Sequence, residues 1–441
     1  MESVVARRPR LFYGWVVVAC AWAMYMLNQA AFTWGFTVFV DPLGKEFGWS
    51  RTSITLAWAL SLGWGLVVSP WFGKALDRFG PRWTTAIGGL LGGLGWALIP
   101  SASSYWQFLV YFVLLVGTGI NGAVGLSGTA AVAQWFKVRR SLAMGIYFTG
   151  SGGAGLLLIP ALSALIEAYG WRTGAAALGV LVLATTAVAA PLLRHKPEQY
   201  GLKPDGELPA NPKRATAHAW DFWRRLPLPK HKGATNESST LAEALRSAAF
   251  WMFTTAIFLR YVGMGITQVH QMPHMLAQDI SLAAATAAIS LSLTVNIPSR
   301  VLVGWMGDLY DKKWLLNLLA IAGGFALLAL AFASPGATGL IWAYAALWGV
   351  GLAMLPLQAS WLADTYGRKH YGSISAMSNS LTLSGRIAGA LGAAVAFDLL
   401  GSYQMVMLLG AGGFALGAVL LALLPSPRPV ATTAATNDAD P

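Results

Sequence analysis

The chain has 441 residues, of which 56% are hydrophobic and only 11% are charged, with a mean hydropathy of +0.56 and a formal net charge of +12. This balance lies far outside that of soluble proteins, so it excludes a soluble multidomain chain and predicts a polytopic membrane protein. The single cysteine, Cys20, excludes an intramolecular disulfide and a cysteine-based metal cluster.

Apolar stretches of about 20 residues, the length at which a helix crosses the hydrocarbon core, recur along nearly the whole chain. The first follows a basic start but is too long for a signal peptide, so we expect it to be retained. Twelve spans are predicted, near residues 13–40, 54–72, 84–101, 106–133, 141–167, 173–193, 248–275, 281–303, 314–333, 338–362, 373–398 and 403–424.

The positive charge is distributed unevenly between the two sides of this bundle. Of the 30 Lys and Arg residues, Lys45, Arg51 and Arg172 lie in loops opposite the N-terminus, three lie inside spans, and the other 24 lie on the N-terminal side. Because positive charge gathers on the cytosolic side, we predict an integral protein of the plasma membrane, or the cytoplasmic membrane of a bacterium, with both termini cytosolic. The excess charge therefore reflects topology and does not indicate nucleic acid binding.

Residues 194–246 differ from everything around them, with six prolines, many charges and no apolar run. They are predicted to be a cytosolic linker between an N-terminal six-helix half over residues 1–193 and a C-terminal six-helix half over residues 247–430. Residues 431–441 are predicted to be a disordered tail.

The two halves repeat one another in sequence. The segment GKALDRFGPRW after the second span is matched by GWMGDLYDKKW after the eighth, and QWFKVRRSLAMG before the fifth by TYGRKHYGSISA before the eleventh. The first pair aligns Gly73 with Gly304, Asp77 with Asp308 and Arg82 with Lys313. Two such halves, related by an axis along the membrane normal, are typical of secondary transporters.

The segment GKALDRFGPR also resembles the signature loop of the major facilitator superfamily, whose positions are filled here by Gly73, Asp77, Arg78, Gly80 and Arg82. FYGWVVV (12–18) and WFKVRRSLAMGIYFTGSGGAG (135–155) resemble the monocarboxylate transporters and the oxalate/formate antiporters within it. The superfamily resemblance covers about residues 10–425 and implies an all-α membrane fold, with twelve helices in two pseudo-symmetric halves that alternate access to a central site.

The chemistry of the signature loop predicts a latch between the halves. Its glycines permit a tight turn and close helix approach, and the carboxylate of Asp77 can face the positive N-terminal end of a neighbouring helix. In the second copy Asp311 replaces the second glycine, so we expect the contact of Asp308 to be weaker or differently partnered. The alternative is that these charges only fix the topology.

Polar and charged residues inside the spans are costly unless they face water or a partner, so each marks a candidate site. Arg300 in the eighth span has Asn296 one turn before it. In the eleventh span Ser375, Asn379, Thr382 and Arg386 share one helical face. In the N-terminal half, Asn28 and Tyr147 are candidates for substrate contact, with interhelical hydrogen bonds as the alternative.

The seventh span carries a similar stripe, flanked by two histidines. The stripe consists of Arg260, Met264, Thr267, Gln268 and Gln271. His274 and His270 lie about 40° and 80° from it. Because histidine exchanges protons near neutral pH, either is a candidate for proton coupling; the alternative is a plain hydrogen bond at the outer helix end.

Three intramembrane arginines facing one cavity would select an anion, and the planar fork of a guanidinium suits a carboxylate. The resemblance implies that Arg300 binds the substrate carboxylate and that Arg386 assists. Two departures are Asn296, where the monocarboxylate transporters usually carry an aspartate, and Trp34, where they use a lysine. Either a histidine replaces their proton relay or the protein exchanges anions.

We therefore predict a secondary transporter that moves a small organic mono- or dicarboxylate with protons or against a counter-anion. Efflux of an amphipathic or neutral compound, with the arginines serving structure, is the alternative, followed by a membrane sensor. No nucleotide loop, catalytic triad, metal-ligand cluster or paired carboxylates appear at workable spacing, so we predict neither an enzyme nor a cofactor.

Overall fold

The computed structural model describes residues 12–205 and 238–424, without the side chains of Trp34, Arg51 and residues 120–123. These residues are helical and include no β-strand, and ten helical runs are long and apolar enough to cross a membrane. One of those runs, Thr52–Ser101, folds back on itself, and the interrupted helix that starts at Tyr105 adds a further pass. The described residues thus cross twelve times, as predicted.

The N-terminal half is built from helices that contain stretches of wider π-type turns. The π-type stretches η1 (Gln29–Trp34), η3 (Val110–Val124) and η4 (Ala154–Leu158) each join two α-helices into one pass. The α-helices are α1 (Tyr13–Asn28), α2 (Phe36–Phe47), α3 (Arg51–Leu98), α4 (Tyr105–Leu109), α5 (Gly125–Trp135), α6 (Arg140–Phe148), α7 (Gly150–Gly153), α8 (Ile159–Tyr169) and α9 (Trp171–Leu192).

The C-terminal half follows the linker, of which residues 206–237 lie outside the described residues, as does the predicted tail over 431–441. A short 3₁₀ turn, η8 (Leu352–Met354), interrupts one of its passes. Its helices are α11 (Leu241–Arg246), α12 (Ala248–Ala277), α13 (Leu282–Leu309), α14 (Lys312–Ala331), α15 (Thr338–Gly351), α16 (Leu355–Tyr366), α17 (Tyr371–Leu400) and α18 (Tyr403–Leu423).

Helix α3 reverses direction at Gly80, the second glycine of the signature segment. Its φ of 80° lies in the region that favours glycine, and a Cβ there would come within 2.7 Å of the ring of His195. The arm before the turn packs against α17 through Gly73, and the arm after it packs against α9 through Gly89. The glycine therefore produces the second and third passes from one continuous helical run.

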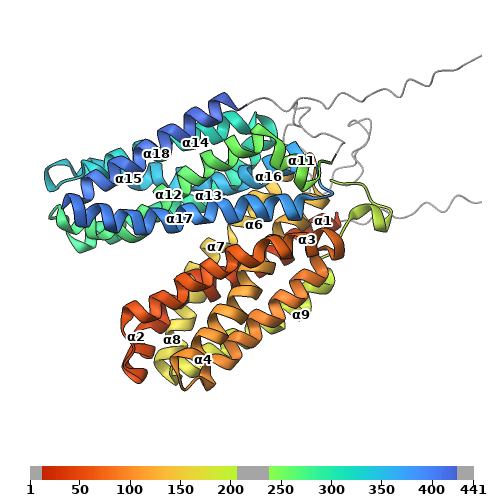
Figure 1. The fold of residues 1–441 in the computed structure, drawn as a ribbon, viewed down its shortest axis with the longest axis horizontal. Coiled ribbons are helices and arrows are strands. Elements are labelled where there is room, and N and C mark those ends of the chain that lie inside the picture. Colours follow the sequence, from red (N-terminus) through yellow and green to blue (C-terminus); the bar gives the residue numbers. More distant parts are fainter. Residues whose placement is uncertain (1–11, 206–237, 425–441) are drawn as a thin grey trace, which may run out of the picture.

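The two halves form separate bundles that touch at one end (Figure 1). They are in contact near α6, α11 and α16, close to the flanks of the linker, and diverge toward α2 and α8 in one half and α15 and α17 in the other. The most extensive contacts between the halves are those of α3 with α17 and of α6 with α13, and α6 also packs against α16.

Glycines bring the backbones of α6 and α13 together. A Cβ added to Gly145 would lie 2.5 Å from the carbonyl oxygen of Arg300, and one added to Gly304 would lie 2.4 Å from that of Ser141. No side chain could occupy either position unless the helices moved apart, because carbon atoms do not approach oxygen so closely.

We expect Gly145→Ala to lower the melting temperature of the purified protein, with a cost of about 1–3 kcal/mol from overpacking. The matched control is Gly63→Ala in α3, where an added Cβ meets nothing within 4 Å. That change should be neutral or stabilise by up to about 1 kcal/mol, because alanine is the better helix former. Thermal unfolding followed by tryptophan fluorescence measures both, and a Gly145→Ala protein as stable as the wild type would contradict the close approach.

Candidate functional site

A cavity of about 930 Å³ lies between the two halves and is lined by residues of both. Hydroxyl and carboxamide groups are spread over its wall. They belong to Tyr25, Gln29, Thr33, Thr37, Ser69, Thr129, Ser151, Tyr261, Thr267, Gln268, Gln271, Ser290, Ser292, Thr294, Asn296, Gln358, Tyr371, Ser375, Asn379, Ser380 and Thr382. Among the described lining residues, Arg300 and Arg386 are the two that carry a charge at neutral pH.

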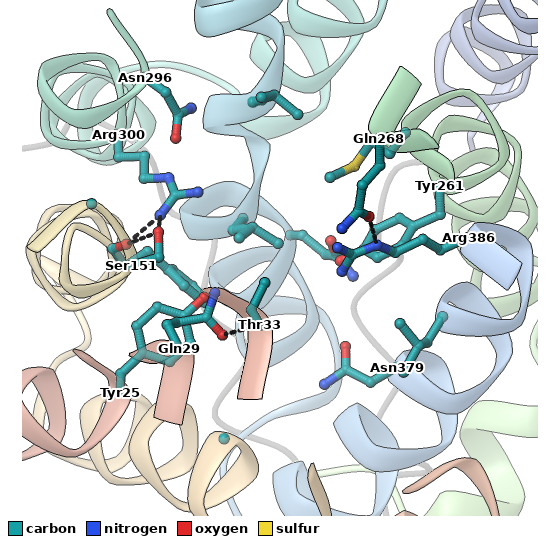
Figure 2. Close-up of a pocket in the computed structure, with 18 of the residues that line it drawn as sticks. Tyr25, Gln29, Thr33, Ser151, Tyr261, Gln268, Asn296, Arg300, Asn379 and Arg386 are labelled. Carbon is teal, nitrogen blue, oxygen red and sulfur yellow. Dashed lines mark hydrogen bonds between the residues drawn. The ribbon is translucent and has the colours of Figure 1, made fainter. Parts of the chain in front are cut away.

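Arg300 reaches across from α13 to the N-terminal half (Figure 2). Its Nη1 donates to the carbonyl oxygen of Phe148 and, at 2.5 Å, to the hydroxyl of Ser151. Its Nε is buried and has no hydrogen-bond partner within the described part of the chain. Asn296, one turn earlier, also lines the cavity but donates to the carbonyl of Gly349 at 2.9 Å, so it braces α15.

Arg386 approaches the cavity from the other side, on α17 (Figure 2). Its Nε donates to Oε1 of Gln268 on α12 at 2.5 Å, and Asn379 lies two turns before it on the same helix. Tyr25 and Tyr261 line the same cavity as the two arginines (Figure 2). Two cations and two phenols thus converge on one space.

The placement of Arg260 differs from the prediction that it faces the cavity. It is fully buried in the C-terminal half, where it donates to the carbonyls of Leu316 and Gly351 at 3.3 and 3.2 Å and lies over the ring of Phe414. The cavity face of α12 begins one residue later, at Tyr261, and one residue turns a helix by about 100°. Arg260 instead satisfies a carbonyl where η8 interrupts the helix.

Four other predicted residues also lie outside the cavity lining. The hydroxyl of Tyr147 donates to the carbonyl of Gly125 at 3.3 Å, and Asn28 lies in α1 behind the lining. His270 and His274 hydrogen-bond to the carbonyls of Ala390 and Leu330 at 3.2 and 2.8 Å. The histidines therefore make the plain interhelical hydrogen bonds of the alternative interpretation, and neither touches the space around the arginines.

The aspartate of the signature loop caps a helix of the opposite half. Asp77 accepts hydrogen bonds from the backbone N–H groups of Gly372 and Ser373, at 2.8 and 2.9 Å, and from the hydroxyl of Ser373 at 2.5 Å. These groups form the first turn of α17, whose positive end favours a carboxylate. The carboxylate thus joins the halves on the side of the linker.

The corresponding aspartate of the second copy makes the same contact with the N-terminal half. Asp308 accepts from the backbone N–H groups of Ser141 and Leu142, at 2.8 and 3.0 Å, in the first turn of α6. The repeat offset is the same for both partners, since 308 − 77 and 372 − 141 each equal 231. Asp308 therefore binds the same kind of partner as Asp77 and not a different one. Asp311, which stands in place of the second glycine, caps its own helix α14 through the N–H of Lys313.

The basic residues of the loop have a different position. Arg78 and Arg82 lie over the rings of Phe79 and Trp83, with the guanidinium carbon 5.2 and 6.0 Å from the ring centres. Both rings are more than half exposed, which is usual for aromatic residues at a membrane interface. Within the described residues these arginines therefore lie at the surface beside the latch.

Further ion pairs and hydrogen bonds close the same end of the molecule. Arg140 of α6 pairs with Asp364 of α16, which also accepts from Lys312 at 2.7 Å. Gln134 and Arg368 each donate to the backbone carbonyl of the other at 2.6 Å. Because each half contributes to these contacts, the cavity is sealed toward the linker.

Many of the polar lining residues were not predicted from the sequence, and three of them carry large polar side chains. Tyr25, Tyr261 and Gln358 face the cavity, and the carboxamide oxygen of Gln358 is buried without a described partner. Tyr25 precedes Gln29 by one turn, and Tyr261 precedes Gln268 by two, so helical spacing contained the signal.

The sequence pattern of the Major Facilitator Superfamily matches residues 15–390 and 272–439. The chain belongs to the major facilitator superfamily. The relatives, the solved structures that resemble it and its twelve-pass fold are those of transporters, so this member of the superfamily is an integral membrane transporter and not an enzyme.

Two relatives and one solved structure are similar to this chain over most of its length. It is 28% identical over 404 residues to monocarboxylate transporter 11 of Homo sapiens, covering 90% of this chain and 74% of that protein. It is 24% identical over 395 residues to the oxalate:formate antiporter of Oxalobacter formigenes, covering 88% and 85%. The structure of a proton:xylose symporter has a TM-score of 0.73 at 14% identity, covering 95% of this chain and 97% of the other, which establishes the fold alone.

We expect Asp77→Asn to slow transport more than it weakens substrate binding. The amide keeps an acceptor oxygen but loses the charge that a helix N-terminus favours, an effect of about 0.3–2 kcal/mol, so the closed contact forms less readily. Transport into proteoliposomes gives the maximal rate and the apparent affinity. Asp311→Asn, which removes a cap within one half, is the matched control, and a large loss of affinity at unchanged rate would argue against the latch.

Proposed function

We propose that this transporter moves a small organic carboxylate by alternating access to the central cavity. The observation that supports this most strongly is that Arg300 and Arg386 converge on one space, with no acidic residue among the described residues that line it. Two positive charges within membrane-spanning helices are costly, and an anion that enters the space removes much of that cost. The site therefore favours anions over neutral and cationic solutes.

A carboxylate suits this cavity better than other small anions. Each guanidinium offers a planar fork that can donate two parallel hydrogen bonds to a carboxylate. The hydroxyls of Tyr25 and Tyr261 and the amide of Asn379 supply further donors around the same space. The names of the two relatives, a monocarboxylate transporter and an oxalate:formate antiporter, agree with this class of substrate.

The contacts at the two ends of the molecule support alternating access. Asp77 and Asp308 close the cavity toward the linker, whereas the halves diverge at the opposite end (Figure 1). If the linker is cytosolic, as the distribution of Lys and Arg predicts, this is an outward-facing state. The inward-facing state then requires both aspartates to leave their helix ends.

We infer that exchange of anions is the better supported mode of coupling. Proton symport needs a titratable group beside the substrate, and His270 and His274 are instead bound to backbone carbonyls outside the lining. Asn296 cannot titrate where the monocarboxylate transporters usually carry an aspartate. Coupling through either histidine remains the second candidate, since both lie on α12 beside its cavity-facing stripe.

A thermal-shift screen tests the substrate class directly. We expect one or more of lactate, pyruvate, formate, oxalate, malonate and succinate to raise the melting temperature of the purified protein. A ligand present at a hundred times its Kd stabilises the folded state by about 2.7 kcal/mol. Arg300→Ala and Arg386→Ala should each abolish both this shift and uptake of the same anion into proteoliposomes.

Arg260→Met is the matched control for these variants. It removes an intramembrane arginine of the same half that does not line the cavity. The anion concentration that gives half of the maximal rise in melting temperature should stay within twofold of the wild-type value. Stabilisation by a cationic dye or a neutral sugar, with no response to any carboxylate, would instead support efflux of an amphipathic or neutral compound.

A further inference from the structure

The interface between α6 and α13 leads from the linker side of the molecule to the cavity. At the end near the linker Asp308 caps α6, and one turn closer to the cavity Gly304 lies against the carbonyl of Ser141. Gly145 then lies against the carbonyl of Arg300. The guanidinium of that same arginine donates to the N-terminal half next to this contact, so the interface includes a charged group of the cavity wall.

Two groups of the N-terminal half hold one nitrogen of this guanidinium. Nη1 donates to the carbonyl of Phe148 and to the hydroxyl of Ser151, and this hydroxyl in turn donates to the same carbonyl at 3.4 Å. Arg300 is only 9% exposed, and its Nε has no partner within the described residues. Both described hydrogen bonds of the guanidinium therefore use Nη1, and the edge formed by Nε and Nη2 takes part in neither.

The related interface on the other side of the molecule lacks such a link. Asp77 caps α17, Gly73 lies against Gly372, and the innermost hydrogen bond runs from the hydroxyl of Ser380 to the carbonyl of Leu66 at 3.2 Å. Both partners of this bond are uncharged. Of the described hydrogen bonds at these two interfaces, those between α6 and α13 include a charged group that also lines the cavity.

We propose that Ser151 is a positioning residue that ties the anion-binding geometry of Arg300 to closure of the interface between α6 and α13. This rests on the proposed carboxylate transport. While the helices are packed together, Ser151 and the carbonyl of Phe148 fix Nη1 and orient the free edge. When the helices separate, Nη1 loses both acceptors, and the guanidinium binds an anion with a different geometry and affinity.

The consequence is a route by which substrate affects the state of the transporter. A ligand shifts a conformational equilibrium only through a difference in its affinity for the two states. Because Ser151 belongs to one half and Arg300 to the other, their contact exists in one state and is broken in the other. A single hydroxyl thus gives the two states different affinities through its hydrogen bond with Arg300.

The test compares four variants of the full-length protein. Ser151→Ala and Ser151→Val remove the hydroxyl. Ser151→Thr keeps the hydroxyl on a side chain of nearly the same shape as valine. As the control on the other interface, Ser373→Ala removes a hydroxyl that donates to Asp77 and does not line the cavity. Hydrogen–deuterium exchange without any anion reports on residues 140–153 and 297–309, and titration with oxalate and with pyruvate gives the Kd.

We expect faster exchange in both segments for Ser151→Ala and Ser151→Val, and exchange like that of the wild type for Ser151→Thr. The Kd of the two hydroxyl-free variants should rise roughly tenfold, as expected for one charge-assisted hydrogen bond. Ser373→Ala should change exchange only in α3 and α17 and leave the Kd within twofold, because Ser373 does not line the cavity.

Two outcomes would overturn the proposal. One is unchanged exchange of α6 and α13 in both hydroxyl-free variants, which can be read whether or not any anion binds. The other is an equal rise in Kd for Ser373→Ala and Ser151→Ala, which would show that loss of closure alone raises the Kd. Failure of oxalate, pyruvate and the other carboxylates to stabilise the wild type would instead refute the proposed substrate class, so the two failures are distinguishable.

Discussion

The arrangement of this protein depends on two carboxylates, each of which caps a helix of the half to which it does not belong. Asp77 binds the first turn of α17 and Asp308 the first turn of α6. A helix N-terminus has backbone N–H groups with no partner inside the helix, so a carboxylate satisfies them and meets the positive end of the helix dipole. Such a contact is specific in geometry, yet it can be broken without exposing apolar surface. It therefore suits an interface that must open and close.

The same interface determines where the cavity charges lie. Close approach of α6 and α13 through Gly145 and Gly304 brings Arg300 within reach of Phe148 and Ser151. Arg386 is held by Gln268 within the C-terminal half and faces the same space. The cavity thus contains one arginine tied to the partner half and one tied to its own. Closure on the linker side and the form of the anion site are consequences of one packing arrangement.

Arg260 shows that an intramembrane arginine need not belong to a transport site. It binds two carbonyls near the interruption of α15 and α16 by η8 and lies over Phe414, so its charge is satisfied inside one half. Breaks in membrane helices leave carbonyls that need donors, since lipid provides none. A buried arginine can supply them. The cost of placing the charge of Arg260 in the membrane is thus offset by hydrogen bonds within the protein. The charge of Arg300, by contrast, faces the cavity, where a ligand can bind.

The sequence by itself determined the membrane class, the twelve passes, the repeat of the two halves and the signature loop, because these follow from hydropathy and from local spacing. It also identified Arg300 and Arg386 as candidates, since charges within apolar spans are rare. Only the tertiary structure decided which side of each helix faces the cavity. Helices that are apolar almost all round carry little directional signal, and one residue of rotation separates Arg260, which is buried among helices, from Tyr261, which lines the cavity. The contact of Arg300 with Ser151 likewise joins residues 149 positions apart, and no local pattern specifies such a pair because it depends on how two separate bundles pack.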